Sequence, residues 1–279
     1  MKIKNIIFKA FTIFSIVVLI GCETSETQTV ATLTNLVWAD EFDTDGAPNS
    51  ENWNLLTGDG TTQGIPGWGN NELQIYTDRS ENVSVQDGVL IITAKEENYQ
   101  GGSYTSARIT TKGKLDQQYG RFEARIKLPS GKGVFPAFWL LGDDEGGNLV
   151  WPQIGEIDIM EYLGDEPTTV FGTIHGPGYS GANSITKKYE ILNDRFDNGF
   201  HVFGVEWSPN RINWYVDGDL YQSITPEDVN EETGGAEWVF NRPFHLILNM
   251  AVGGNLPGSP DGNTVFPQRM LVDYVRVYN

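Results

Sequence analysis

Residues 155–162 (GEIDIMEY) place three carboxylates in a segment whose other side chains favour a β-strand. Side chains alternate faces along a strand, so Glu156 and Asp158 share one face, whereas a regular strand would turn Glu161 to the other. A β-bulge at Ile159-Met160 would add one residue and return Glu161 to the face of the other two acids. The segment therefore predicts a bulged strand that lines a groove with three carboxylates.

Two carboxylates that face one cleft are the catalytic groups of glycoside hydrolysis, because one attacks the sugar and the other protonates the leaving oxygen. A third acid between them shares a proton or hydrogen bond and drives the pKa values of its neighbours apart. The plainer interpretation is a solvated edge strand. Ile157, Tyr162 and Leu163 favour the catalytic interpretation, because they would bury the opposite face of the strand.

Strand signals continue along most of the chain. They consist of β-branched and aromatic residues in partial alternation, and they cover residues 89–94, 120–128, 171–175, 201–207, 212–216, 245–251 and 271–278. The pairs Asp87-Gly88 and Asp217-Gly218 are typical of two-residue hairpin turns. With 32 glycines, 13 prolines and few helical patterns, the sequence favours an all-β domain of two stacked antiparallel sheets.

The first residues predict export. Residues 1–21 combine three lysines with an apolar run, which is the pattern of a signal peptide. Cys22 is the only cysteine, so an intrachain disulfide is excluded. Residues 22–34 are rich in Thr, Ser, Glu and Gln and predict a flexible tether. Residues 35–279 have no compositional break and predict a single domain.

The formal net charge is −18, and removal of the signal peptide would take away Lys2, Lys4 and Lys9 and no acid, which gives −21. Such an acidic chain disfavours nucleic acid and anionic membrane surfaces as partners. No His, Cys or Asp pattern has the spacing of a zinc site, and no glycine-rich loop has phosphate-binding context. We therefore expect chemistry that needs no cofactor for catalysis.

Several ordered motifs resemble glycoside hydrolase family 16, and within it the bacterial endo-1,3-β-glucanases called laminarinases. The resemblance covers about residues 36–278 and rests on GWGNNELQIYT (67–77), SARITTKGK (106–114), YGRFEARIKLPSGKGVFPAFWLLG (119–142), GEIDIMEYLG (155–164), TIHG (173–176), LILNMAVGGN (246–255) and FPQRMLVDYVRVY (266–278). It implies a β-jelly-roll sandwich of the concanavalin A-like type with an open concave cleft. It also implies Glu156 as nucleophile, Glu161 as general acid/base and Asp158 as the residue that orients and tunes them.

The resemblance also implies which residues line the cleft. These substrate-binding candidates are Trp151, Arg108, Trp139, Trp68, Asn71, Glu72 and His175. Sugar rings stack on aromatic side chains, while polar neighbours reach the hydroxyl groups. A tryptophan in a β-sandwich lies more often in the core, and a lone histidine is more often structural. We expect four other tryptophans to be packing residues: Trp53, Trp207, Trp214 and Trp238.

Two further sites follow from the resemblance. Residues 19–22 (LIGC) resemble a bacterial lipobox, which implies lipidation of Cys22 and a lipoprotein that faces the periplasm or the cell exterior. Many relatives bind a structural calcium ion on the convex side. The matching positions here are Glu41, the main-chain oxygen of Gly88, and Asp273, although two scattered acids are not a calcium signature by themselves.

The sequence thus predicts a retaining endo-1,3-β-glucanase, tolerant of mixed-linkage 1,3-1,4-β-glucan. Its expected partners are the glucan polymer and, through the lipid anchor, a membrane, and we expect a monomer. One alternative is a family-16 hydrolase of a galactan such as agar or carrageenan. Phe135 and Leu256 leave this open, because many relatives carry Trp or another aromatic residue there. The other alternative is a non-catalytic glycan-binding lipoprotein, because a fold does not fix a function.

Overall fold

The computed structural model describes residues 32–144 and 147–279, in which almost all regular structure is β. The strands form two sheets that enclose one hydrophobic core. This arrangement is a β-jelly roll, and the predicted fold class is confirmed. Strands of both sheets contribute to the same main core cluster.

The inner sheet has seven strands in the described residues, and β10 is an interior strand between β9 and β11. In sheet order the strands are β12 (Ile185–Glu190), β11 (Thr169–His175), β10 (Glu156–Tyr162), β9 (Val134–Gly142), β16 (Phe244–Val252), β7 (Arg108–Thr110) and β2 (Asn54–Leu56). Neighbouring strands all pair antiparallel. The acidic segment therefore occupies a central strand, and its charges cannot be those of a solvated sheet edge.

The outer sheet has ten strands in the described part of the chain. Eight follow one path: β15 (Asp219–Ile224), β14 (Arg211–Val216), β13 (His201–Ser208), β8 (Gly120–Lys127), β17 (Gln268–Tyr278), β5 (Val89–Tyr99), β6 (Gly102–Ser106) and β3 (Gln74–Tyr76). Strand β1 (Leu36–Asp40) pairs with β17, and β4 (Val83–Gln86) pairs with β5. The expectation of purely antiparallel sheets is wrong at one edge, because β3 and β6 pair parallel.

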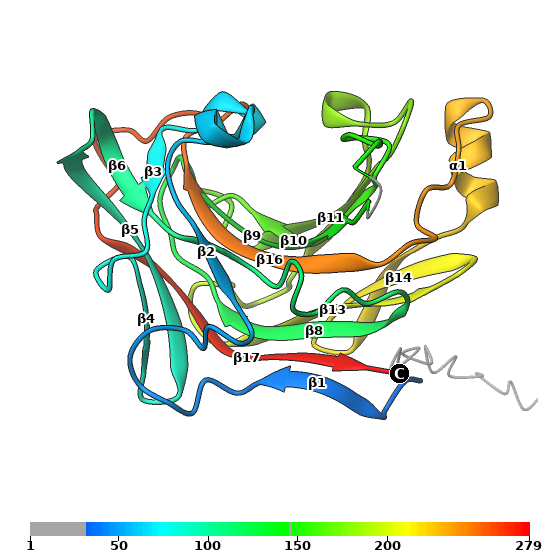
Figure 1. Cartoon of the computed structure of the whole chain (residues 1–279), viewed down its shortest axis with the longest axis horizontal. Coiled ribbons are helices and arrows are strands. Elements are labelled where there is room, and N and C mark those ends of the chain that lie inside the picture. The colour runs from blue at the N-terminus through cyan, green and yellow to red at the C-terminus, as the bar shows by residue number, and fades with distance from the viewer. Residues whose placement is uncertain (1–31, 145–146) are drawn as a thin grey trace, which may run out of the picture.

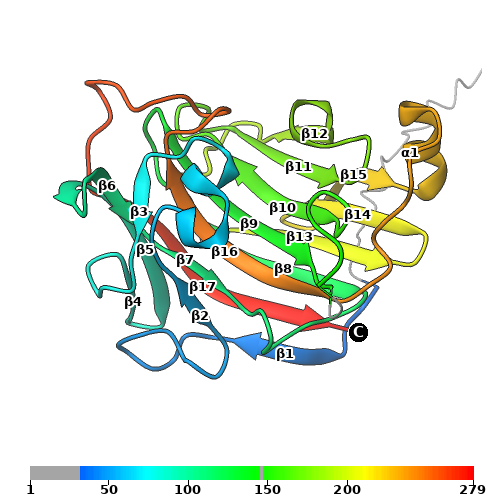
Figure 2. The same ribbon diagram turned by 45° about the horizontal axis from the view of Figure 1, so that its top comes forward.

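Figure 1 shows β9, β10, β11 and β16 as a curved layer above β8 and β17, with its hollow side turned to the top of the view. The turned view in Figure 2 shows the strands of the inner sheet side by side across the floor of this hollow. Short helices stand at its rim: η1 (Thr61–Gln63), η2 (Pro66–Gly69), η3 (Gly181–Asn183) and α1 (Pro226–Thr233). The hollow face is therefore the face on which a long ligand can lie.

Every strand expected from alternation is present, and most ends agree within two residues. The larger differences are β5 and β17, which extend to Tyr99 and begin at Gln268. Both hairpin turns form as predicted, because Asp87 (φ 52°), Gly88 (φ 75°), Asp217 (φ 52°) and Gly218 (φ 90°) all have positive φ. Helix α1 was not predicted, although Thr225 and Asp228 form a capping box at its start.

The core between the sheets is rich in aromatic residues. Trp53, Trp207 and Trp214 are almost completely buried, and Trp238 packs against the same core cluster. The prediction that these four tryptophans are packing residues is confirmed. Trp214 also donates a hydrogen bond to the main chain of β10, which packing alone does not explain.

The chain enters the domain on the side away from the hollow. Asn35 and Asn279 exchange main-chain hydrogen bonds at 3.2 and 2.9 Å, so the first and last strands lie side by side at the base of the view in Figure 1. The predicted signal peptide and Cys22 lie outside the described residues. Residues 32–144 and 147–279 contain no helix of the length and hydropathy needed to cross a membrane.

Candidate active site

The bulge predicted at Ile159-Met160 is present in β10. Up to Asp158 the strand keeps one register with β9 and β11, and beyond it both registers are shifted by one residue. Ile159 and Met160 both join the hydrophobic core as a result, instead of pointing to opposite faces. The side chain of Glu161 consequently returns to the face that carries Glu156 and Asp158.

Each outer carboxylate of this group is held by a side chain from a neighbouring segment. The indole Nε1 of Trp151 donates to Glu156 Oε2 at 2.7 Å. The hydroxyl of Thr173 on β11 donates to Glu161 Oε2, also at 2.7 Å. Asp158 lies between them, and its buried Oδ2 faces Nε2 of His175 at 3.3 Å. One oxygen of each glutamate is therefore held by a donor, while the aspartate faces the histidine ring.

Burial and repulsion between the carboxylates raise the pKa values of Asp158 and Glu161. Burial raises the pKa of Asp158 well above its usual range, and the charges of Glu156 and Glu161 raise it further. Burial also raises the pKa of Glu161, and this effect outweighs the Thr173 hydrogen bond, which lowers it. Both carboxyls therefore bind a proton more readily than an exposed Asp or Glu does. An environment that keeps one carboxyl protonated is the one that general acid catalysis needs.

His175 closes the group from β11, where it pairs directly with Glu156. Its Nε2 lies 3.3 Å from Asp158 Oδ2 and 3.7 Å from Glu156 Oε1. Burial lowers the pKa of His175, but the contact with Asp158 and the charges of the acids outweigh burial and raise it to about 9. The amide of Gly181 opposes this rise, because it donates to Nδ1 at 3.1 Å and an accepting nitrogen carries no proton. The neutral ring with its proton on Nε2 fits this geometry.

Arg108 is buried between two of the predicted tryptophans. Its guanidinium carbon lies 4.6 Å from the centre of the Trp68 ring and 4.8 Å from that of Trp139. Both distances are within the range of cation–π attraction. Arg108 Nε has no hydrogen-bond partner among the described residues. The structure therefore brings Trp68 of η2 together with Arg108 and Trp139 of the inner sheet as one stacked unit.

A polar network connects this unit to Glu72. Trp139 Nε1 donates to Asn249 Oδ1 at 2.7 Å, and Asn249 Nδ2 donates to the hydroxyl of Tyr76 at 3.1 Å. The Tyr76 hydroxyl in turn donates to Glu72 Oε2 at 3.3 Å. Burial raises the pKa of Glu72, although the nearby charge of Arg108 lowers it. The network fixes the ring of Trp139 at the centre of the sheet.

Three residues of this site were not predicted from the sequence: Tyr76, Thr173 and Asn249. Asn249 had a recognisable signal, because it is the one polar residue among the apolar residues that follow His245 in β16. A polar side chain in such a run needs a buried partner. Tyr76 and Thr173 had no such signal, because both are ordinary residues of a half-buried strand.

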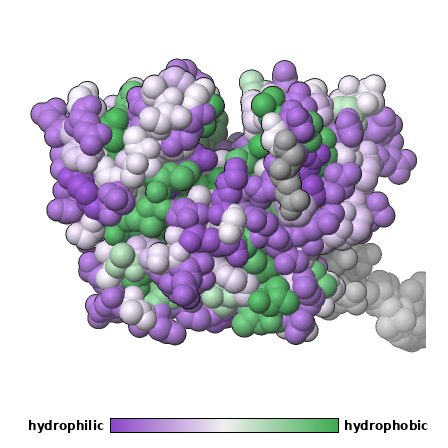
Figure 3. All heavy atoms as spheres, in the orientation of Figure 1, coloured by the Kyte–Doolittle hydropathy of each residue, from purple (hydrophilic) through white to green (hydrophobic). Residues whose placement is uncertain are grey.

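The predicted residue Asn71 joins two loops at one end of the hollow. Its Nδ2 donates to Asn255 Oδ1 at 2.8 Å, and the neighbouring Glu72 forms a β-bridge with Gly253. Figure 3 shows the hollow as a notch at the top of the molecule, with a wall on each side. Trp151 stands beside the catalytic group with 45% of its surface exposed, so it remains free to contact a ligand. Trp151, His175 and Trp139 thus lie beside the three acids, whereas Asn71 and Glu72 contact the loop that contains Gly253 and Asn255.

The predicted calcium ligands are engaged by other groups. Glu41 forms two hydrogen bonds with Arg276, at 2.7 and 2.8 Å, and Asp273 pairs with Arg125 at 2.6 Å. Neither acid belongs to a group of three or more His, Cys, Asp or Glu side chains in residues 32–144 and 147–279. This arrangement does not fit a preformed calcium site, because each carboxylate is already neutralised by an arginine. The calcium site remains an untested prediction.

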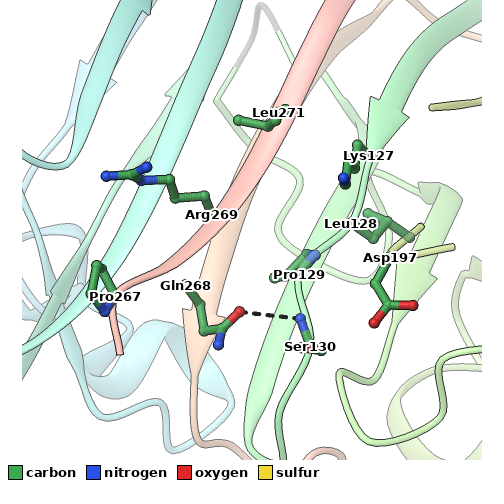
Figure 4. Close-up of a pocket in the computed structure, with 9 residues that line it drawn as sticks. All are labelled: Lys127, Leu128, Pro129, Ser130, Asp197, Pro267, Gln268, Arg269 and Leu271. Atoms are coloured by element: carbon green, nitrogen blue, oxygen red, sulfur yellow. Dashed lines mark hydrogen bonds between the residues drawn. The ribbon is translucent and has the colours of Figure 1, made fainter. Parts of the chain in front are cut away.

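A separate pocket of about 370 Å³ lies away from the acids, where the end of β8 meets the start of β17. Figure 4 shows its lining, in which Gln268 accepts a hydrogen bond from the main chain of Ser130. Asp197 is the one acid among its lining residues, beside the cations Lys127 and Arg269. This pocket therefore lacks the paired carboxylates of the cleft, so the inner sheet carries the candidate site of chemistry.

Comparisons with known proteins agree with this geometry. The model of the Glycosyl hydrolases family 16 matches residues 70–275. The "Beta-glucanase" of Rhodothermus marinus is 44% identical over 284 residues, which are 100% of this chain and 96% of that protein. The "Glucan endo-1,3-beta-glucosidase A1" of Niallia circulans is 40% identical and is covered over 38% of its length, against 88% of this chain. The laminarinase catalytic domain from Thermotoga maritima MSB8 superposes with a TM-score of 0.82 at 50% identity, covering 88% of this chain and 98% of that one.

The raised pKa of Asp158 predicts a cost in stability. A carboxyl whose pKa is higher folded than unfolded destabilises the fold as pH rises above the unfolded value of about 3.9. Asp158→Asn removes that loss, so we expect it to raise the melting temperature at pH 7 but not at pH 3. The expected gain is about 3 to 5 °C for each unit by which folding raises the pKa. Calorimetry at both pH values measures it, with the exposed Asp78→Asn as control. A gain of the same size at pH 3 would show that the cause is packing and not charge.

Proposed function

The chain belongs to the glycosyl hydrolases of family 16, and on this basis we propose that it is an endo-acting 1,3-β-glucanase. Among the proteins similar to this chain are ones named beta-glucanase, glucan endo-1,3-beta-glucosidase and laminarinase. The observation that carries the proposal is the bulged strand, which brings three acids to one face of an open hollow. A non-catalytic glycan-binding protein has no need of such a group, whose burial costs stability.

The proposed mechanism is a double displacement with retention of configuration. Glu156 attacks the anomeric carbon, with Trp151 holding its Oε2 so that the other oxygen faces the sugar. Glu161 protonates the departing glycosidic oxygen and then takes a proton from the incoming water, as its raised pKa allows. Asp158 lies between the two and shares its proton with them, so that one glutamate is ionised while the other is protonated.

An internal cut in a polymer requires a cleft that is open at both ends, so that the chain can lie across the floor without threading through it. The curved inner sheet provides such a floor, and the two walls in Figure 3 leave it open from above. Trp151 on one side of the acids and Trp139 on the floor offer ring faces for sugar units. Linear glucan is therefore the substrate class that the site fits.

Glu156→Gln tests the proposal directly. The amide is too weak a nucleophile to form the glycosyl-enzyme intermediate, so we expect hydrolysis of laminarin to fall at least about 1,000-fold. The melting temperature should change little. Reducing-end and product analysis on laminarin, barley mixed-linkage glucan, agarose, κ-carrageenan and a cellulose derivative measures both activity and breadth. The exposed Glu190→Gln is the matched control.

Each outcome of that assay has a distinct meaning. Short oligosaccharides from laminarin, absent with Glu156→Gln, support the proposal, and cleavage of the barley glucan sets its breadth. Cleavage of agarose or κ-carrageenan alone would keep the mechanism and overturn the substrate. Near-normal activity of Glu156→Gln would overturn the assignment of the nucleophile.

The hydroxyl of Thr173 predicts a change in pH dependence. Its hydrogen bond to Glu161 lowers the pKa of that carboxyl, so Thr173→Val raises the pKa further. A general acid works only while it is protonated, so a higher pKa extends activity to higher pH. We expect the basic limb of the kcat/KM profile to move upward in Thr173→Val and to stay in place in Thr173→Ser, which keeps a hydroxyl. A downward shift in Thr173→Val would contradict this arrangement.

We propose further that the enzyme is a lipoprotein attached through Cys22. Support comes from the path of the chain at its entry to the domain. The amide and hydroxyl of Thr32 donate to the carboxylate of Glu206 at 2.7 and 2.8 Å. Glu206 points outward from the outer sheet, because Phe203, Val205 and Trp207 of the same strand belong to the core. A tether attached at this face begins on the side of the domain away from the cleft, so the anchor would not obstruct the cleft.

Cys22→Ala tests the anchor. In cells that express the full chain, we expect the wild type in the membrane fraction and Cys22→Ala in the soluble fraction, with equal specific activity. Metabolic labelling with a fatty acid should mark the wild type alone. Membrane association of Cys22→Ala at the wild-type level would contradict lipidation as the cause.

A further inference from the structure

A side chain of the outer sheet reaches the catalytic strand from below. Trp214 lies on β14, is fully buried, and donates its indole N–H to the main-chain oxygen of Asp158 at 2.8 Å. Asp158 is the last residue before the register of β10 shifts against both neighbours. The acceptor is therefore at the start of the bulge, where the regular ladder is interrupted.

Gly172 on β11 makes this contact possible. It is the single residue opposite Ile159 and Met160, because Asp158 pairs with Thr173 and Glu161 pairs with Phe171. A Cβ atom on Gly172 would lie 2.6 Å from Trp214 Cδ1 and 2.4 Å from the hydroxyl of Tyr221. The absent side chain thus leaves the space that the two aromatic rings fill beneath the bulge.

The contact has no substitute in its surroundings. Trp214 is fully buried between the sheets and Asp158 is 3% exposed, so water has little access to replace a lost hydrogen bond. An unpaired buried carbonyl costs about 1 to 3 kcal/mol. A strand that closed the bulge to recover regular pairing would rotate Glu161 off the cleft face, because side chains alternate. The indole N–H therefore favours the one register in which all three acids share a face.

We propose that Trp214 is a positioning residue for catalysis, which holds the bulge open through the Asp158 carbonyl while Gly172 leaves room for the ring. The inference rests on the proposed function for its kinetic readout. Trp214 touches no substrate, so its effect is on the placement of Glu161 and not on binding of the glucan. The turnover number should depend on it, and the affinity for the polymer should not.

Trp214→Phe removes the N–H and keeps an aromatic ring. We expect kcat on laminarin to fall about 10- to 100-fold, because displacement of a catalytic group by about 1 Å has an effect of this order. KM should remain within about twofold, because the binding surface is intact. Hydrogen exchange in peptides that span residues 156–162 should become faster. Gly172→Ala should act in the same direction, because its Cβ pushes on the ring of Trp214.

Trp207→Phe is the matched control. Trp207 lies on the adjacent strand β13, is equally buried, and donates its Nε1 to the main-chain oxygen of Phe240 at 3.2 Å, away from β10. We expect a similar loss of melting temperature with kcat and exchange of residues 156–162 unchanged.

The outcomes separate the two proposals. Equal kcat and equal exchange in the Trp214→Phe and Trp207→Phe variants would overturn the positioning role, even if the wild type cleaves laminarin. A wild type that cleaves no glucan would overturn the proposed function, and the exchange measurement would still decide the role of Trp214. If Trp214→Phe does not fold, exchange and kcat in Gly172→Ala carry the test.

Discussion

One extra residue in a central β-strand is the constraint on which the site depends. Without it, Glu161 would point into the core between the sheets, where an ionised carboxylate has no partner and a large desolvation cost. With it, Ile159 and Met160 both enter the core, and three acids share the cleft face. The same irregularity thus satisfies the hydrophobic core and forms the group of three acids to which we assign catalysis.

The site is electrostatically unfavourable, and its surroundings limit that cost. Three carboxylates on one face of a strand repel each other, and burial weakens the screening of their charges by water. Trp151 and Thr173 each supply one charge-assisted hydrogen bond to a glutamate. Asp158 Oδ2 has a longer contact, 3.3 Å from His175 Nε2, and burial outweighs it and raises the pKa of the carboxyl. A carboxyl that binds a proton readily suits the proposed chemistry, and the expected cost in stability accompanies it.

Much of the fold could be read from the sequence, because alternation and hairpin turns are local. The strands, the turns at Asp87-Gly88 and Asp217-Gly218, and the bulge were all predicted from short segments. The supporting contacts could not be, because they join distant segments: Trp214 is 56 residues from Asp158. A tryptophan in an alternating strand predicts burial but does not say which carbonyl its N–H reaches. For the same reason, the arginines that neutralise Glu41 and Asp273 were not foreseen.

The stacked unit of Trp68, Arg108 and Trp139 shows how the rest of the cleft is kept rigid. A lysine would not serve in place of Arg108, because a planar guanidinium stacks between two rings, whereas an ammonium group retains its water. The cation lies near the carboxyl of Glu72, and Asn249 and Tyr76 connect that carboxyl to the ring of Trp139. Ring, cation and acid therefore constrain one another within the inner sheet. In a chain with a net charge of −18, this buried cation also offsets the negative potential where a neutral polymer must settle.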